Sequence, residues 1–404
     1  MSVPVLSTPL SLAMARSPQF VTGKNNALSN DSLDAMTLGV AIYSGLKSTS
    51  VTNNYNLTKN YSINEVINFE ISDLVRSEFN HDFSVWNDIG YTQSPPAEVL
   101  WVRPTGSWTY SNAGSVPETF PFATGAGSAY ITTDGWATRD NIAPVAVSQL
   151  VLATSRDRQV LIGNYESLAL NNSVVNDLAE IEIVWNNGDD ETFYTSAGNP
   201  VPPDPSSNNS QDLVIYAGVG PANLENNPYI DNLIKPSNHE AGDYYDVNLR
   251  DSGGDTITSV RYYLICEPKY DPVQVAFINR FGVADFITFF KRSDERGNFT
   301  QDSYQKSIYN DGFTTPSLEI GKYQSFNVNS RNTLTLNTGF VDQNYDETIE
   351  DILMSEYVAV YTNSNWVSVV PNRGSIEYQK SVNTKLINYT MSFDFGFDER
   401  SLVR

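Results

Sequence analysis

The chain has 404 residues, of which 40% are hydrophobic and 18% are charged, and its formal net charge is −22. This length and apolar content support real hydrophobic cores, so a disordered protein is excluded. The negative charge repels phosphate backbones and anionic lipids, and we therefore expect neither a nucleic-acid partner nor a membrane partner.

Strand-like runs dominate residues 1–140, which we assign to an N-terminal β domain. Short apolar runs bounded by Gly, Pro, Asn or Asp are typical of strands. The runs are TLGVAIYSG (37–45), EVINFEIS (65–72), EVLWVRP (98–104) and AYITTDGW (129–136). A short helix is expected at 71–79, where Ile71, Leu74 and Val75 share one face.

Residues 141–265 form the acidic middle of the chain, predicted to be a second β domain. Residues 161–260 hold 16 acidic and 2 basic residues, so their net charge is 2 − 16 = −14. The runs AEIEIVW (179–185) and TSVRYYLI (258–265) predict strands, and NNGDD after the first run predicts a hairpin turn. The segment 197–212 is rich in Pro, Ser and Asn and is expected to be an exposed loop or linker.

Residues 266–404 are predicted to be a β-rich α+β domain. VQVAFIN (273–279) and DFITFFKRS (285–293) flank the turn NRFG, which predicts a hairpin that packs this domain. A helix is expected at about 343–356, with Asp342 as its N-cap and Tyr345, Ile349, Ile352 and Leu353 on its apolar face.

The last predicted strand has the strictest alternation in the chain. In INYTMSFDFGF (387–397) every second residue is apolar, which predicts one buried and one wet face. The residues expected on the buried face are Ile387, Tyr389, Met391, Phe393, Phe395 and Phe397. EYVAVYT (356–362) and WVSVV (366–370) add two strands. The predicted fold is therefore mostly β, a multidomain antiparallel β-sandwich architecture with one or two short helices, at about 343–356 and 71–79.

The sequence holds few residues for nucleophilic or metal chemistry. It has two histidines, His81 and His239, both in polar loop-like contexts, and one cysteine, Cys266. A zinc site needs three or four ligands at close spacing, and a nucleophile needs an adjacent base. Ser128 in GAGSAY lacks the glycine two residues later that a nucleophile elbow requires. We therefore assign no catalytic, cofactor-binding or metal-binding residue and expect that the chain is not an enzyme.

Acidic clusters are the one enzymatic pattern that composition leaves open. Asp189, Asp190 and Glu191 are adjacent, and Asp243 and Asp246 flank two tyrosines. Glycosidases place two carboxylates across a sugar-binding cleft, often beside aromatic residues. The hairpin turn accounts for the first cluster more simply, and surface acids of an acidic chain account for both.

Four tryptophans, Trp86, Trp101, Trp108 and Trp136, fall in the N-terminal third. Such residues form carbohydrate-binding platforms, but core and interface packing is their commoner use. Calcium binding at the acidic residues is a further open alternative, although no EF-hand-like spacing is present.

The single cysteine cannot form an internal disulfide, which fits folding in a reducing cytoplasm. Because it follows the apolar run RYYLI, Cys266 is expected to be a small buried hydrophobe. The N-terminal segment lacks a basic stretch followed by an apolar core, so we expect no signal peptide.

Three blocks in the last third resemble a family of structural proteins from tailed bacteriophages, many of them phages of marine bacteria. The blocks are Cys266–Ser293, Thr333–Tyr361 and Val382–Arg404. Segments 66–79 and 129–137 resemble the family more weakly, and the region around 197–212 departs from it. The resemblance implies a virion component of the tail or baseplate that assembles in the host cytoplasm, and no enzymatic activity.

We therefore expect a structural subunit that contacts other tail, baseplate or neck proteins and forms a symmetric homo-oligomer in the particle. Two alternatives stay open. One is a head decoration or neck protein of the virion. The other is an adsorption protein that binds carbohydrate, which rests on the aromatic residues and acidic clusters.

Overall fold

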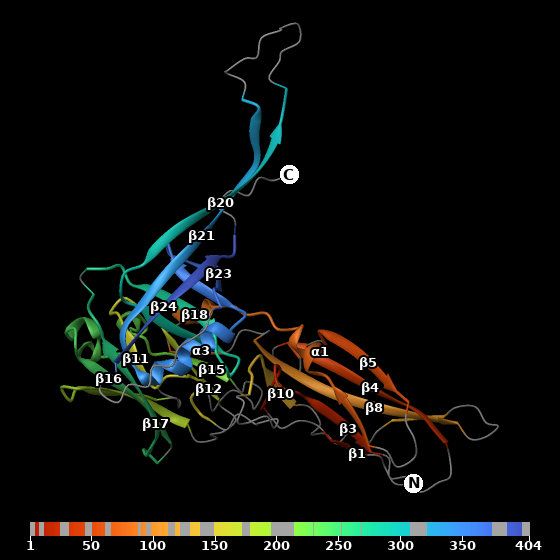
Figure 1. The fold of residues 1–404 in the computed structure, drawn as a ribbon. Helices are drawn as coiled ribbons and strands as arrows, with labels where there is room; N and C mark the ends of the chain where they lie inside the picture. The colour runs from red at the N-terminus through yellow and green to blue at the C-terminus, as the bar shows by residue number, and fades with distance from the viewer. Residues whose placement is uncertain are drawn as a thin grey trace. The chain divides into compact units, whose positions relative to one another are not determined.

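The computed structural model describes most of the chain as short strands joined by turns (Figure 1). The described residues are 5–7, 12–24, 32–44, 51–60, 66–87, 90–93, 98–111, 118–121, 130–137, 149–171, 178–194, 214–228, 230–251, 253–267, 269–307, 321–373 and 386–397. They separate into two compact units. Unit 1 comprises Met1–Cys266, Ala276–Ile287 and Glu347–Ser355, and unit 2 comprises Glu267–Val275, Thr288–Asp346 and Glu356–Arg404.

The first part of unit 1 is a β-sandwich. One antiparallel sheet has the order β1-β3-β6, with β1 Val5–Ser7, β3 Phe20–Lys24 and β6 Val66–Glu70. The other has the order β2-β10-β8-β4-β5, with β9 beside β8; the bounds are β2 Leu12–Met14, β10 Tyr130–Thr133, β8 Val99–Ser111, β4 Ser32–Ser44, β5 Asn53–Lys59 and β9 Glu118–Pro121. Met36, Leu38, Val40 and Ile42 alternate along β4 into the core between the two sheets.

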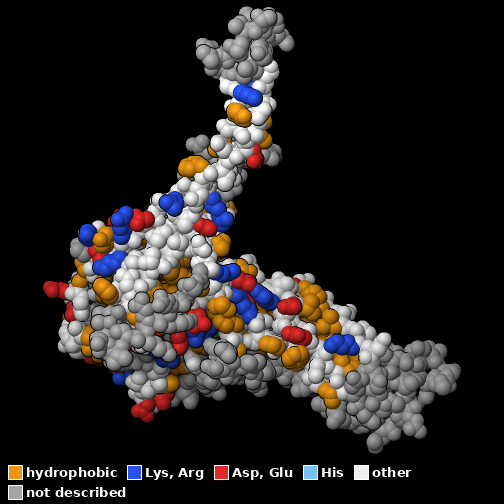
Figure 2. Space-filling view, viewed as in Figure 1, with side chains coloured by type: hydrophobic (Ala, Val, Ile, Leu, Met, Phe, Trp, Pro, Cys, Tyr) orange, Lys and Arg blue, Asp and Glu red, His pale blue; other side chains and the backbone are white. Residues whose placement is uncertain are grey.

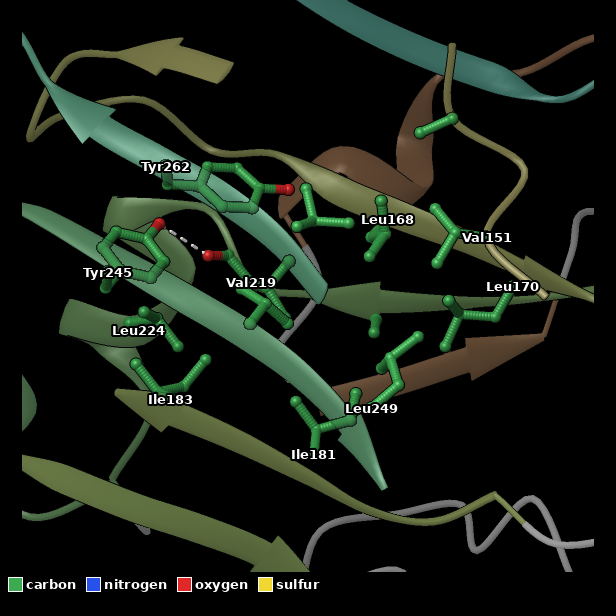
Figure 3. Packing of buried hydrophobic residues seen from close by; sticks show 14 of the residues in the cluster. Val151, Leu168, Leu170, Ile181, Ile183, Val219, Leu224, Tyr245, Leu249 and Tyr262 are labelled. Carbon is green, nitrogen blue, oxygen red and sulfur yellow. Dashed lines mark hydrogen bonds between the residues drawn. The ribbon is translucent and has the colours of Figure 1, made fainter. Parts of the chain in front are cut away.

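The second part of unit 1 is another sandwich with its own core. Its larger sheet has the order β11-β17-β16-β13-β14, with β11 Asp157–Val160, β17 Thr256–Leu264, β16 Tyr244–Asp251, β13 Leu178–Trp185 and β14 Asp190–Tyr194. The smaller sheet is β12-β15-β7, with β12 Ser167–Asn171, β15 Val214–Gly218 and β7 Gly90–Gln93. Figure 3 shows Leu168 and Leu170 packed opposite Ile181 and Leu249. The predicted NNGDD turn is confirmed: it joins β13 to β14, and Gly188 has φ +95°.

Short helices flank these sheets. Helix α1 (Ser72–Arg76) confirms the predicted helix near 71–79, with Ile71 and Val75 fully buried. The other short segments are α2 Pro221–Asn226, η1 Ser84–Asn87, η2 Asn232–Ile234 and η3 Pro236–Asn238. The second predicted helix is also confirmed, as η4 (Gln343–Tyr345) followed by α3 (Asp346–Met354). Asp342 precedes η4 but makes no side-chain capping hydrogen bond, so that detail of the prediction was wrong.

The hairpin predicted at 273–293 is confirmed as β18 (Val273–Ile278) and β19 (Ala284–Phe289). The Gly282 amide donates to the Asn279 carbonyl at 2.8 Å, and Gly282 has φ +77°, the left-handed conformation that glycine adopts readily. Residues 276–287 of this hairpin belong to unit 1.

Unit 2 contains the antiparallel strands β22 (Val358–Thr362), β23 (Asn365–Pro371), β24 (Leu386–Phe395), β21 (Tyr323–Asp342) and β20 (Asp294–Gln305), in that order. The predicted alternation of β24 holds from Ile387 to Phe393, whose side chain is fully buried. It was wrong beyond that point: Phe395 is half-buried and Phe397 is 71% exposed, because the strand ends at Phe395.

The fold is thus mostly β, as predicted, with sandwiches, short helices and largely antiparallel pairing. Among the described strands, β10 pairs with β2 and β11 pairs with β17 in parallel. The predicted three-part division stays a prediction, and the predicted loop 197–212 lies outside the described residues. Among the helices of the described chain, none is long and apolar enough to cross a membrane.

Candidate functional site

Strands β20 and β21 form a two-stranded ribbon that extends past the rest of their sheet (Figure 1). The second half of β21, from Thr333 to Asp342, pairs with β24. Its first half, from Tyr323 to Asn332, pairs with β20 only. We call residues 294–306 and 322–332 the arm. At about 3.4 Å per residue, the ten residues from Tyr323 to Asn332 give a ribbon roughly 30 Å long.

The arm is a strand pair without a core. Every residue of β20 is exposed. Hydrophobic side chains nevertheless occur along the ribbon, and Figure 2 shows them scattered over its largely uncharged surface. Those more than a third exposed are Phe299, Tyr304, Tyr323, Phe326 and Val328. An isolated two-stranded ribbon is marginally stable in water, so exposed aromatic residues on such a ribbon make it a candidate contact surface.

The arm differs in charge from the rest of the chain. Four basic residues, Arg296, Lys306, Lys322 and Arg331, stand against three acidic ones, Asp294, Glu295 and Asp302, so its net charge is 4 − 3 = +1. The remainder of the chain then carries −22 − 1 = −23. A neutral to basic element on an acidic protein is a place where other acidic molecules approach with little repulsion.

A second candidate is a set of ionisable side chains buried in unit 1. His81 Nε2 lies 3.0 Å from Asp134 Oδ2, and the Arg16 guanidinium donates to both Asp134 oxygens at 2.9 and 2.7 Å. Burial by itself would raise the pKa of Asp134, but the hydrogen bonds and charges of Arg16 and His81 outweigh it and hold that pKa below its usual value.

Glu98 lies on the other side of the His81 ring, with its Oε1 4.0 Å from His81 Nδ1. Burial raises the pKa of Glu98 to about 8, although the nearby Tyr216 hydroxyl and Ala284 amide lower it in part. Neither Glu98 oxygen has a hydrogen-bond partner of good geometry in the described part of the chain. Glu98 is therefore protonated at neutral pH, which removes the cost of a buried charge.

A further buried group joins the second sandwich to the β18–β19 turn. Arg158 pairs with Asp285 and, at 3.2 Å, with Glu166, and all three side chains are at most 5% exposed. Burial raises the pKa of Glu166 to about 7, against the opposing charge of Arg158. Paired in this way, these groups fix the position of residue 285 against the sandwich, which is a structural role.

Arg280 continues this arrangement at the turn itself. Its guanidinium donates to Asp351 at 2.9 Å and to Glu347 at 3.0 Å, both on α3. Thr154 donates to the other Asp351 oxygen at 2.7 Å. Burial raises the pKa of Asp351 to about 6, although Arg280 and Thr154 lower it in part. Arg280 therefore forms local ion pairs with two acids of α3.

The other basic residues at the end of the hairpin also form local ion pairs. Lys291 pairs with Glu267 at 2.6 Å, and Arg292 pairs with Asp294 at 2.7 Å. Each of these cations meets an acid of the same unit. Within the described residues, no group of three or more His, Cys, Asp or Glu side chains is placed to hold a metal ion.

The acidic clusters singled out in the sequence are occupied by local contacts. Asp189 accepts from Asn187 at 2.6 Å in the turn, and Asp243 accepts from Asn186 at 3.0 Å. Asp246 pairs with Arg261 at 2.6 Å. Glu191 accepts from the Asp231 amide at 2.7 Å. These contacts favour the interpretation as turn and surface acids.

The aromatic and thiol candidates also serve as packing or surface residues. Trp101 is buried, Trp86 packs edge-on against Tyr165, and Trp136 lies under the Arg16 guanidinium. The side chain of Trp108 lies outside the described residues. Cys266 is exposed, so its predicted burial was wrong; it follows the end of β17, where the alternation of that strand no longer applies.

Sequence reasoning missed both the arm and the buried ionisable groups. The residues of β20 are polar, and only the interspersed Phe299, Thr300 and Tyr304 signal a strand. His81, which sequence context places in a polar loop, has a fully buried side chain. Its partners Glu98 and Asp134 are remote in sequence, so no local pattern reveals the group.

No protein-family model matches the chain, and no curated protein matches it. Among solved structures, a marsupial T cell receptor aligns over 91% of this chain and 98% of its own, at 10% identity and a TM-score of 0.16. At that TM-score the alignment carries no argument about fold or function.

Proposed function

We propose that this chain is a non-enzymatic structural subunit of a bacteriophage virion, a component of the tail or baseplate. The observation that carries the proposal is the arm, a ribbon with every β20 residue exposed and with uncovered aromatic side chains. A monomer gains nothing from such an element, whereas a subunit of an assembly uses it to contact a neighbour. The resemblance of the last third to phage structural proteins supplies the kind of assembly.

The remaining features support a mechanical role. The two sandwiches of unit 1 have separate hydrophobic cores, and buried ion pairs hold the β18–β19 turn to the second sandwich and to α3. Rigid sandwiches of this kind maintain spacing between contact surfaces, and loops and strand edges make the contacts. The side chains that would perform catalysis are instead engaged in packing or local ion pairs.

Mass spectrometry of purified particles tests the proposal. The particles are those of the phage whose genome encodes the chain, washed at high salt to remove adsorbed host protein. We expect the chain at a stoichiometry that matches a ring or wedge of the tail. Absence from the particles would overturn the proposal, and labelling confined to the head would favour the decoration or neck alternative instead.

A further inference from the structure

We propose that β20 pairs, antiparallel and edge to edge, with β20 of a second copy of this chain, in the register that places Phe299 opposite Phe299. This inference rests on the proposed function, since it names the partner of the arm. It makes the two arms into one continuous sheet related by a two-fold axis, in which each β20 residue contacts its counterpart reciprocally.

The first argument is that β20 is an unpaired edge. It ends the strand order of its sheet, and no described strand pairs with its outer side. Proteins protect long edges with charged side chains, above all lysine, with proline or with a bulge. The run DERGNFTQDSYQ carries four charged residues but neither lysine nor proline. The irregularity near Thr300 places an extra residue, Asn327 at φ +53°, in β21, so β20 itself stays regular.

The second argument is charge complementarity in the proposed register. With Phe299 at the centre, Arg296 of one copy lies opposite Asp302 of the other, and this ion pair forms twice. Along the same pairing Asp294 lies opposite Tyr304, and Glu295 lies opposite Ser303. Directly opposed side chains project from the same face, so the paired charges meet.

Two other registers oppose like charges. A register centred on Asn298 places Asp294 opposite Asp302, which opposes like charges. A register centred on Glu295 places two glutamates opposite each other. The register centred on Phe299 uses β20 from Asp294 to Tyr304, brings two exposed phenylalanines together and opposes no like charges. Phe299 is 75% exposed in the single chain, so this contact removes apolar surface from water.

The third argument concerns the long-range repulsion between copies. Two chains of net charge −22 repel each other over most of their surfaces. The arm, at +1, adds nothing to that net negative charge. Arg296 and Asp302 are both exposed, and Asp302 accepts one hydrogen bond from Asn327 at 2.8 Å, which leaves its other oxygen for the second copy.

Charge reversal of the full-length chain tests the register by sedimentation velocity. Arg296→Asp opposes two aspartate pairs and Asp302→Arg opposes two arginine pairs, so each variant alone should associate about tenfold more weakly than the wild type. An equimolar mixture of the two variants restores both ion pairs in a heterodimer, and we expect it to associate like the wild type. A variant that merely damaged the arm would not be rescued by the other.

A cysteine pair gives an independent readout. In a Cys266→Ser background, which removes the only native cysteine, Phe299→Cys should form a disulfide-linked dimer under mild oxidation. Ser303→Cys is the matched control: it is equally exposed on the same strand, but in this register it lies opposite Glu295 and should not link.

A monomeric wild-type chain, an unrescued mixture, or linking at position 303 and not at 299 would overturn the inference. In the last two cases another edge, another register or another protein covers the arm, and the proposed virion function stands. If instead the edge pairing is found but the chain is absent from the particles, the proposed function fails and the pairing stands.

Discussion

Glu98 shows how a single buried carboxyl makes stability depend on pH. Its pKa rises from 4.5 to about 8 in the folded chain, where it faces His81, Tyr216 and the more distant Asp82. The folded state therefore keeps a proton that the unfolded state loses between those values. The contribution of Glu98 to the free energy of unfolding therefore falls as the pH rises from about 4.5 to about 8.

We predict that Glu98→Gln removes the part of the pH dependence that Glu98 causes. Glu166 and Asp351, with pKa values of about 7 and about 6, contribute to the slope at lower pH, so the effect of the substitution is clearest between about pH 7 and 8. The amide keeps the shape of the protonated acid and cannot ionise, so at pH 9 the variant should be more stable than the wild type by a few kcal/mol, at about 1.4 kcal/mol per pKa unit. Urea unfolding at several pH values measures it. Glu295→Gln, at an exposed position, is the control that should leave the slope unchanged. If the free energy of unfolding of Glu98→Gln changes with pH as steeply as that of the wild type, the raised pKa of Glu98 is contradicted.

Phe393 tests the buried face of β24. Its side chain is fully buried and packs edge-on against Phe289, with ring centroids 6.1 Å apart. We predict that Phe393→Ala lowers the free energy of unfolding by about 3–5 kcal/mol, through lost burial and a cavity. Phe397→Ala, four residues on and 71% exposed, should change it by at most about 0.5 kcal/mol. Equal effects of the two substitutions on chemical denaturation would refute the assigned face.

At the scale of elements, the β18–β19 turn packs by backbone contact against the segment after β10. The Trp136 amide donates to the Arg280 carbonyl at 2.8 Å. A Cβ on Gly282 would lie 2.3 Å from the Gly135 amide nitrogen, and a Cβ on Gly135 would lie 2.5 Å from the Arg280 carbonyl oxygen. Glycine at both positions is what allows this approach.

We predict that Gly282→Ala destabilises the chain by about 3 kcal/mol or more, because the methyl group meets backbone atoms that cannot move aside. Gly188→Ala is the control. Gly188 also has positive φ, at +95°, but a Cβ there meets nothing within 4 Å. Gly188→Ala should lower the free energy of unfolding only by the cost of placing alanine at a positive φ, about 1–2 kcal/mol. Thermal unfolding of the two variants measures the difference, and equal losses would show that close packing at the turn contributes nothing.

Elements with a local signal were predictable from the sequence, and contacts between distant elements were not. Alternation identified β24 as far as Phe393, and the NRFG turn identified the β18–β19 hairpin. The exposure of Phe397 depends on where β24 ends, which its alternation does not encode. The meeting of His81, Glu98 and Asp134 depends on how separate strands pack. The arm was not predicted, because strands without a buried face show no regular alternation of apolar and polar residues.

At the scale of the whole molecule, the arm separates stability from assembly. The described part of the arm holds almost no buried side chain, with Ser330 the exception at 4% exposure. Removing it should therefore leave the hydrophobic cores of both units intact. Association, in contrast, should depend on it entirely if the arm is the contact surface.

We predict the outcome of replacing residues 299–330 by Asn-Gly, which closes a two-residue hairpin between Asn298 and Arg331, a paired position in the ribbon. The free energy of unfolding should change by no more than about 1 kcal/mol, because the described residues removed make few buried contacts. In sedimentation velocity the shortened chain should remain monomeric at concentrations where the intact chain associates. If the shortened chain associates equally well, the arm is not the assembly surface. If it unfolds, the Arg296→Asp variant, which keeps the ribbon, still reports whether association depends on β20.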